Sequence, residues 1–192
     1  MADGIYEIRW HGRGGQGAVT AARIVAEAAY LKGYRGVTAA PSFGAERRGV
    51  PVSASTRISR EPILILSQVV EPDIVVVLDQ TLLAYPEVTD GMHPDGWLIV
   101  NTNHLPQDLG FNGRLSTVTV DATSICRELG LVLAGLTLVN IAILGAFARA
   151  TGLVDVESIT HVLKERFSGK ALDANLTAVR RTYEATHMDH KG

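Results

Sequence analysis

The sequence contains very little cysteine. Among its 192 residues only Cys126 carries a thiol, so the chain alone cannot form an internal disulfide, a cysteine-rich zinc site or a cysteine-ligated iron–sulfur cluster. Cys126 falls on an apolar face of a predicted helix, where a buried and unreactive thiol is expected. Any chemistry that depends on such clusters would therefore have to come from other chains.

The sequence also lacks an excess of charge of either sign. It has 18 Lys and Arg against 20 Asp and Glu, a formal net charge of -2, so it offers no basic surface for nucleic acid. The N-terminal stretch lacks the basic start and apolar run of a signal peptide, and we expect a cytoplasmic protein. With 46% hydrophobic and 6% aromatic residues, the composition predicts a globular chain with one domain over residues 1–192.

A single long stretch, residues 131–148, carries no charged side chain. Its length is close to the minimum for a membrane-spanning helix. Gly130 and Gly135 near its start and Asn140 within it leave only about four helical turns before Arg149. We therefore expect a helix buried on nearly all sides, which either fills the core or docks another subunit, and no membrane span.

Hydrophobic periodicity predicts an α/β fold with parallel strands at its centre, a β-hairpin, and helices concentrated toward the C-terminus. Strands are expected at residues 5–11, 36–40, 50–59, 63–67, 74–78, 97–100 and 116–120. The hairpin joins 50–59 to 63–67 through Arg60-Glu61-Pro62. Helices are expected at 16–32, 122–129, 136–150, 156–166 and 171–186, with Gly130, Gly152 and Gly169 as stops.

A glycine-rich motif lies between the first predicted strand and the first predicted helix. It reads Gly12-Arg13-Gly14-Gly15-Gln16-Gly17 and satisfies G-x-G-x-x-G, a pattern whose free N–H groups and helix dipole can hold a phosphate. A dinucleotide-binding fold should also place an acidic residue at the end of the second strand. Residues 36–41 contain no acid, which disfavours NAD. A tight turn without any ligand remains an alternative.

Other polar residues follow the predicted strands. Arg47 and Arg48 lie in the loop after the second strand, where they suit a phosphate-rich ligand or an acidic partner surface, although a solvated loop explains them equally well. Asp79 ends the central strand and either contacts a ligand or caps the next helix. His11 is expected to be hydrogen-bonded rather than ligand-binding. We assign neither Asp79 nor His11 to the site.

Histidines give no metal signal. His93, His104, His161, His187 and His190 show no zinc-like arrangement with acids or cysteine. His187 and His190 are three residues apart but fall in the terminal tail, where disorder is expected.

Three segments carry a resemblance to a known family. They are residues 7–17 (EIRWHGRGGQG), 42–52 (SFGAERRGVPV) and 71–79 (EPDIVVVLD). In this order they closely resemble the gamma subunit of the pyruvate:ferredoxin oxidoreductase family, the 2-oxoacid oxidoreductases of anaerobes, and the likeness covers nearly the whole chain. The forms of the motifs are more similar to the pyruvate and branched-chain enzymes than to those for 2-oxoglutarate or indolepyruvate.

The resemblance implies a Rossmann-like domain with a mostly parallel sheet. It also implies a hetero-oligomer of alpha, beta, gamma and delta subunits. Such an enzyme decarboxylates a 2-oxoacid, most simply pyruvate, on thiamine diphosphate with magnesium, passes electrons through iron–sulfur clusters to ferredoxin, and releases CO2 and acetyl-CoA. This chain has no thiamine-diphosphate motif, so we expect those cofactors on the partners and no catalytic or metal-binding residue here. The resemblance assigns coenzyme A binding to Gly12, Arg13, Gly14, Gly15, Gln16, Gly17, Arg47 and Arg48.

Two alternatives stay open at the level of sequence. In the first, the chain is a stand-alone NADP-dependent reductase in which Arg47 and Arg48 read the 2′-phosphate. In the second, the chain is a purely structural subunit whose glycine loop binds nothing.

Overall fold

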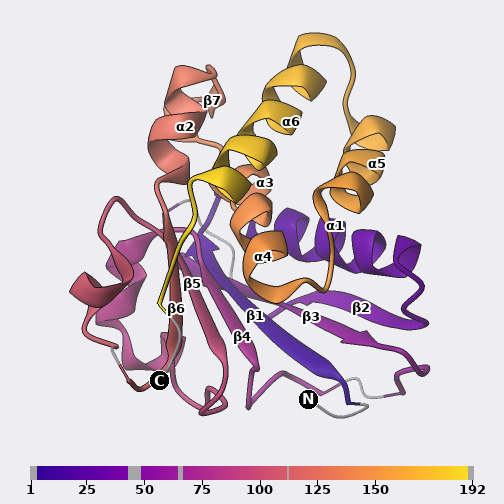
Figure 1. The fold of residues 1–192 in the computed structure, drawn as a ribbon, viewed down its shortest axis with the longest axis vertical. Helices are drawn as coiled ribbons and strands as arrows, with labels where there is room; N and C mark the ends of the chain where they lie inside the picture. Colours follow the sequence, from indigo (N-terminus) through magenta and orange to yellow (C-terminus); the bar gives the residue numbers. More distant parts are fainter. Residues whose placement is uncertain (1–3, 43–48, 65–66, 112, 190–192) are drawn as a thin grey trace.

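The protein is built on a seven-stranded sheet (Figure 1). The computed structural model describes residues 4–42, 49–64, 67–111 and 113–189. In spatial order the strands of this sheet are β2 (Gly36–Pro41), β3 (Pro51–Ser59), β1 (Tyr6–Arg13), β4 (Ile74–Val77), β5 (Trp97–Asn101), β6 (Ser116–Val120) and β9 (His187–Asp189). β1, β4, β5 and β6 are parallel neighbours, whereas β3 and β9 run antiparallel to theirs. Five of the seven strands thus point the same way, as predicted.

The helices follow the predicted concentration toward the C-terminus. Those of the α type are α1 (Ala18–Leu31), α2 (Ala122–Glu128), α3 (Val139–Ala142), α4 (Leu144–Thr151), α5 (Val156–Arg166) and α6 (Gly169–Glu184). Three short 3₁₀ helices are η1 (Gln80–Ala84), η2 (Pro86–Val88) and η3 (Pro106–Leu109). The α-helices lie together beyond one face of the sheet (Figure 1).

The first three elements form a β-α-β unit with an extra strand inserted. β1 and β2 point the same way across α1, and β3 lies between them, antiparallel to both. β1 continues through Gly12 and Arg13, further than predicted, because these residues still pair with Val52 and Pro51 of β3. Small buried residues on α1, among them Ala21 and Ala28, let the helix lie close to this part of the sheet.

The predicted hairpin between residues 50–59 and 63–67 is wrong. Both edges of β3 are already paired, one with β1 and one with β2, which leaves no place for another strand. Residues 60–64 pass instead against the start of β2: a Cβ on Gly36 would lie 2.2 Å from the carbonyl oxygen of Glu61. Leu64 is 92% exposed, which is incompatible with a core strand at this position.

The central strand β4 is covered on both faces, as its continuous apolar sequence predicts. Ile74 and Val76 belong to the large apolar cluster on the helix side. Val75 and Val77 belong to a second cluster on the other side, which includes Leu82 of η1. Ligands of open α/β sheets bind near the carboxyl ends of such strands. Packing on both faces of β4 therefore holds in place the strand end at which ligands of such sheets bind.

The predicted helix over residues 136–150 begins later and is interrupted. Residues 131–138 carry a small hairpin of β7 (Val132–Leu133) and β8 (Leu136–Thr137), which turns through Ala134 and Gly135, both with positive φ. Only α3 and α4 are helical, and α4 is buried over most of its length. A Cβ on Gly145 would lie 2.1 Å from the Val179 carbonyl oxygen, so α4 crosses α6 at very short range. Within the described ranges, no helix is long and apolar enough to span a membrane.

Disorder was expected in the terminal tail, and this expectation is wrong for His187. His187 lies in β9 and pairs with Thr119 of β6, and Met188 pairs with Val118. The free edge of β6 provides this pairing site, which the sequence of the tail does not reveal. His190 lies outside the described residues.

Candidate functional site

The glycine segment, residues 12–17, turns the chain from β1 into α1. Gly15 and Gly17 have φ of 91° and 81°, values that favour glycine. Gly17 occupies the N-cap position of α1, where the described residues provide no side-chain cap, and the first turn holds no acidic residue. The N–H groups at this helix start therefore have no side-chain acceptor in the described part of the chain and can bind an anion.

The same glycines also allow close packing. A Cβ on Gly17 would lie 2.4 Å from Nδ2 of the buried Asn140, and one on Gly15 would lie 3.1 Å from Cδ1 of Leu136. Packing alone thus requires a small residue at position 17. The motif has a structural role in addition to any role in binding.

Arg13 points its charge into the protein rather than toward a ligand. Its Nε lies 2.9 Å from Oδ2 of Asp79, and its terminal nitrogens donate to the Gly49 carbonyl oxygen at 3.1 Å and to the Thr81 hydroxyl at 2.8 Å. All three nitrogens of the guanidinium are therefore in use. The arrangement fixes the end of β1 to the end of β4.

Asp79 acts as a cap, one of the two roles that the sequence left open. Its Oδ1 accepts hydrogen bonds from the backbone N–H of Thr81 at 3.0 Å and from the Thr81 hydroxyl at 2.6 Å, at the start of η1. Burial by itself would raise the pKa of this carboxyl, but the hydrogen bonds from Thr81 and Arg13 outweigh it and lower the pKa. Asp79 is thus held as a charged, paired carboxylate.

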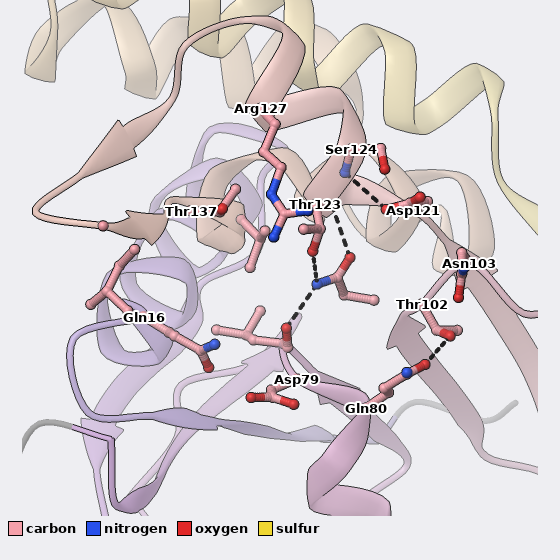
Figure 2. A pocket seen from close by; sticks show the side chains of 15 residues that line it. Gln16, Asp79, Gln80, Thr102, Asn103, Asp121, Thr123, Ser124, Arg127 and Thr137 are labelled. Carbon is pink, nitrogen blue, oxygen red and sulfur yellow. Dashed lines mark hydrogen bonds between the residues drawn. The ribbon is translucent and has the colours of Figure 1, made fainter.

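A cavity of about 430 Å³ opens at the carboxyl ends of β4, β5 and β6 (Figure 2). Its lining comes from regions that are distant in sequence: the glycine segment, the start of η1, the end of β5 with the loop after it, the start of α2 with Arg127, and the β8 hairpin with the start of α3. The lining residues are Gln16, Leu78, Asp79, Gln80, Asn101, Thr102, Asn103, Asp121, Thr123, Ser124, Arg127, Gly135, Leu136, Thr137 and Val139. The cavity is mainly polar and is large enough for part of a nucleotide-sized ligand.

Gln16 connects the glycine segment to this cavity. Its Oε1 accepts a hydrogen bond from the backbone N–H of Arg13 at 2.7 Å, and its own N–H donates to the Arg13 carbonyl oxygen at 2.9 Å. These two bonds fix the turn. The side chain lies at the edge of the cavity, below Thr137 and Arg127 in this view (Figure 2).

Asn101 joins the floor of the cavity to α2. Its Nδ2 donates to the Leu78 carbonyl oxygen and to the Thr123 hydroxyl, both at 2.9 Å, and its Oδ1 accepts from the Thr123 N–H at 3.2 Å. Asp121 caps α2 by accepting a hydrogen bond from the Ser124 N–H at 2.9 Å. These bonds hold the α2 wall, which we define as Asp121, Thr123, Ser124 and Arg127, against the strand ends.

Comparison with known proteins identifies the family. The model of the pyruvate ferredoxin/flavodoxin oxidoreductase family matches residues 7–185. The chain belongs to this family. The chain is 49% identical over 185 residues to the pyruvate/ketoisovalerate oxidoreductases common subunit gamma of Pyrococcus furiosus, covering 95% of this chain and 97% of that one. Over 158 residues it is 48% identical to pyruvate synthase subunit PorC of Methanosarcina barkeri, covering 82% and 84%.

Solved structures agree with the sequence comparison. A crystal structure of the pyruvate oxidoreductase subunit PORC from Thermotoga maritima is 38% identical, covers 97% of this chain and 99% of that one, and superposes with a TM-score of 0.84. A 2-oxoglutarate:ferredoxin oxidoreductase from Magnetococcus marinus, solved with coenzyme A and succinyl-CoA bound, gives a TM-score of 0.75 at 17% identity over 94% of this chain and 31% of that one. This last likeness shows the fold alone.

The chain is therefore a gamma subunit of a pyruvate/2-oxoacid ferredoxin oxidoreductase, as the three sequence segments indicated. The findings support this assignment over a stand-alone NADP-dependent reductase. The expected α/β fold with a mostly parallel sheet is confirmed.

The predicted site residues of this family member do not all meet in one place. Gln16 lines the cavity, and Gly12, Gly14, Gly15 and Gly17 form the turn that carries it. Arg13 lies beside them but is bound to Asp79. Arg47 and Arg48 lie outside the described residues.

His11 and Cys126 take the roles expected of them within the protein. His11 accepts a hydrogen bond at Nε2 from Arg9 Nε at 3.1 Å, and burial, followed by the charge of Arg9, lowers its pKa to about 4. Trp10 faces the helices, so His11 faces the other side of the sheet. Cys126 is buried, and burial raises the pKa of its thiol to about 12. Across the described ranges, no group of His, Cys, Asp and Glu side chains could hold a metal ion.

Sequence reasoning missed most of the cavity lining. Asn101, Thr102 and Asn103 directly follow or end β5, and Asp121 and Thr123 directly follow β6. Their position after parallel strands was a usable signal, because carboxyl ends of such strands gather ligands. Arg127 gave no comparable signal, since it lies at the end of a short helix.

Proposed function

We propose that this gamma subunit provides part of the coenzyme A site in an oxidoreductase assembled from alpha, beta, gamma and delta subunits. The proposed overall reaction converts pyruvate and coenzyme A to acetyl-CoA and CO2, with electrons passing to ferredoxin. The chain works in the cytoplasm as a single gamma domain over residues 1–192, and it carries no residue that makes or breaks bonds. Relatives named as gamma subunits and as pyruvate synthase subunits support this proposal.

The observation that carries the proposal is the cavity beside an uncapped helix. Its volume of about 430 Å³ lies within the range of roughly 300 to 1,000 Å³ that is common for small-molecule sites. It opens at the carboxyl ends of parallel strands, next to the start of α1. Coenzyme A contains a pyrophosphate, which is the type of group that helix N-termini bind.

The residues of this chain bind and orient the ligand. The N–H groups at the start of α1 bind the pyrophosphate, and Gln16 holds the turn in the required shape through its two hydrogen bonds to Arg13. The ion pair of Arg13 with Asp79 keeps the floor of the cavity electrically neutral, so an anionic ligand meets little repulsion there. We infer that Arg47 and Arg48, which follow β2 in the sequence, add positive charge to this site.

We place thiamine diphosphate, magnesium and the iron–sulfur clusters on the partner subunits. When bound there, they supply the decarboxylation chemistry and the path for electrons. The donor set of this chain supports the placement, because cysteine-ligated clusters need several thiolates and Cys126 is a single, buried thiol whose pKa is raised to about 12.

The test uses the whole complex, reconstituted with variant gamma subunits. Arg47→Ala and Arg48→Ala should each raise the KM for coenzyme A by about 5- to 50-fold, the range expected for loss of one polar contact to a charged group. Gln16→Ala should raise it by a similar factor, because the turn that presents the N–H groups of α1 loses the hydrogen bond from the Arg13 N–H to Gln16 Oε1. The KM for pyruvate should change less than about twofold in each variant.

Arg35→Ala is the matched control, because Arg35 is exposed and lies between the end of α1 and the start of β2, away from the cavity. An unchanged KM for coenzyme A in all three test variants would mean that the chain is a purely structural subunit. Saturable NADPH binding with hydride transfer by the chain alone would also overturn the proposal.

A further inference from the structure

The charged side chains that line the cavity differ in whether they have a partner within the protein. Three charged side chains line it: Asp79, Asp121 and Arg127. Asp79 is paired with Arg13, and Asp121 caps α2 through the Ser124 N–H. Among the described lining residues, Arg127 is the only cation, and its side chain forms no hydrogen bond or ion pair with the described part of the chain.

Arg127 is also directed at the cavity. It comes from the last turn of α2, and its guanidinium points inward, beside Thr123 and Thr137 (Figure 2). Asn101 and Asp121 anchor α2 through their bonds to Thr123 and Ser124. A charged group on an anchored helix, directed at a polar cavity and left without a partner, is suited to binding an anion.

Coenzyme A carries a pyrophosphate and a terminal phosphate. The position of Arg127 relative to the glycine segment indicates which of the two each wall of the cavity binds. Gln16, in the turn that precedes α1, and Arg127, on α2, enter the cavity from different walls (Figure 2). Backbone N–H groups suffice for the singly charged phosphates of a pyrophosphate diester. A terminal phosphate monoester carries a charge of about -1.5 to -2 at pH 7 and gains more from a guanidinium, which can bind it through two parallel hydrogen bonds.

We propose that Arg127 binds the 3′-phosphate of coenzyme A. This inference rests on the proposed function. It adds a side chain that belongs neither to the glycine segment nor to the pair Arg47 and Arg48. It assigns the pyrophosphate to the glycine segment and the 3′-phosphate to the α2 wall. The site therefore distinguishes coenzyme A from analogues that lack the 3′-phosphate.

The experiment compares coenzyme A with 3′-dephospho-coenzyme A in the reconstituted complex. Arg127→Ala should raise the KM for coenzyme A by about 10- to 100-fold. The KM for the dephospho analogue should stay within about twofold of wild type, because the contacted group is absent from it. Arg127→Lys should recover part of the loss, since a single ammonium replaces the fork of the guanidinium.

Size-exclusion chromatography of each complex checks assembly, and Arg127→Gln serves as a second variant that removes the charge but keeps a polar side chain. Equal increases for both substrates, or no increase for either, would overturn the inference. If Gln16→Ala raises the KM for coenzyme A while Arg127→Ala leaves it unchanged, only the 3′-phosphate contact fails. If Gln16→Ala, Arg47→Ala, Arg48→Ala and Arg127→Ala all leave it unchanged, the proposed coenzyme A site fails as well.

Discussion

The two sides of the cavity use their polar side chains in opposite ways. On the glycine segment, Arg13 is bound to Asp79, Thr81 and Gly49, and the Gln16 side chain is bound to the backbone of Arg13. What remains available there is backbone, the N–H groups at the start of α1. On the α2 wall, backbone groups are capped by Asp121, and the side chain of Arg127 remains available.

This difference shows how a sequence motif and a binding site can diverge. The motif places glycines where the chain must turn tightly and pack closely, and its one arginine stabilises that turn. The positive charge directed into the cavity comes instead from a helix more than 100 residues later in the chain. A motif-based assignment therefore finds the backbone half of the proposed site and misses the side-chain half.

The largest expected effect tests the packing role of the glycine segment. Gly17→Ala should lower the free energy of unfolding by about 3 kcal/mol, because the new methyl group clashes with Asn140 and the backbone has φ of 81°. Gly152→Ala is the control, since Gly152 has φ of 63° but no atom within 4 Å of the added Cβ; it should lose only about 1 kcal/mol. Urea unfolding of both variants measures the difference. Equal losses would mean that backbone strain alone accounts for the requirement.

Local patterns predicted most of the fold, and nonlocal pairing accounts for the errors. The apolar run at residues 74–78 and the glycine motif were sufficient for β4 and for the β1 to α1 turn. The insertion of β3 between β1 and β2 depends on which strand edges meet in space, which no local pattern contains. In the same way, residues 131–137 alternate too little in polarity to distinguish a hairpin from a helix.

The site was predictable to a smaller extent. Gln16 follows from the motif, because the turn of a strand into a helix is a local feature. Both roles considered for Asp79 were derivable from its place after a strand, but its partner Arg13 lies 66 residues away. Arg127 reaches the cavity only because Asn101 holds α2 over the strand ends through Thr123. Such tertiary anchoring has no signature in a single sequence.

The next prediction, with a smaller expected effect, tests whether the charge on Asp79 stabilises the glycine segment. Asp79→Asn should cost about 1 kcal/mol at pH 7, since the pair with Arg13 is partly exposed. The pKa of Asp79 is lowered in the folded protein, so its contribution is present above the ordinary value of about 4 and is lost as the pH falls through the lowered pKa. The difference between wild type and variant should therefore shrink below about pH 4.

Urea unfolding across this pH range measures the dependence on Asp79. Asp173→Asn, at an exposed position on α6, is the control and should show no comparable change between neutral and acid pH. A difference for Asp79→Asn that stays constant down to pH 2 would show that shape, and not charge, accounts for its contribution.

The prediction with the smallest expected effect compares what Arg127 and Arg13 each contribute to the free energy of unfolding. Arg127→Ala should change the free energy of unfolding by less than about 0.5 kcal/mol, because in the described structure its guanidinium has no partner to lose. Arg13→Ala should cost about 1 kcal/mol, because it leaves Asp79 without its cation. Thermal and urea unfolding of the two variants of the free subunit measure this difference. If Arg127→Ala destabilises the subunit as much as Arg13→Ala does, its guanidinium has a structural partner and the contrast between the two sides of the cavity is wrong. If it does not, a large loss of coenzyme A affinity in the complex is not caused by unfolding of the α2 wall, and the comparison of coenzyme A with its 3′-dephospho analogue tests whether the lost contact is the one to the 3′-phosphate.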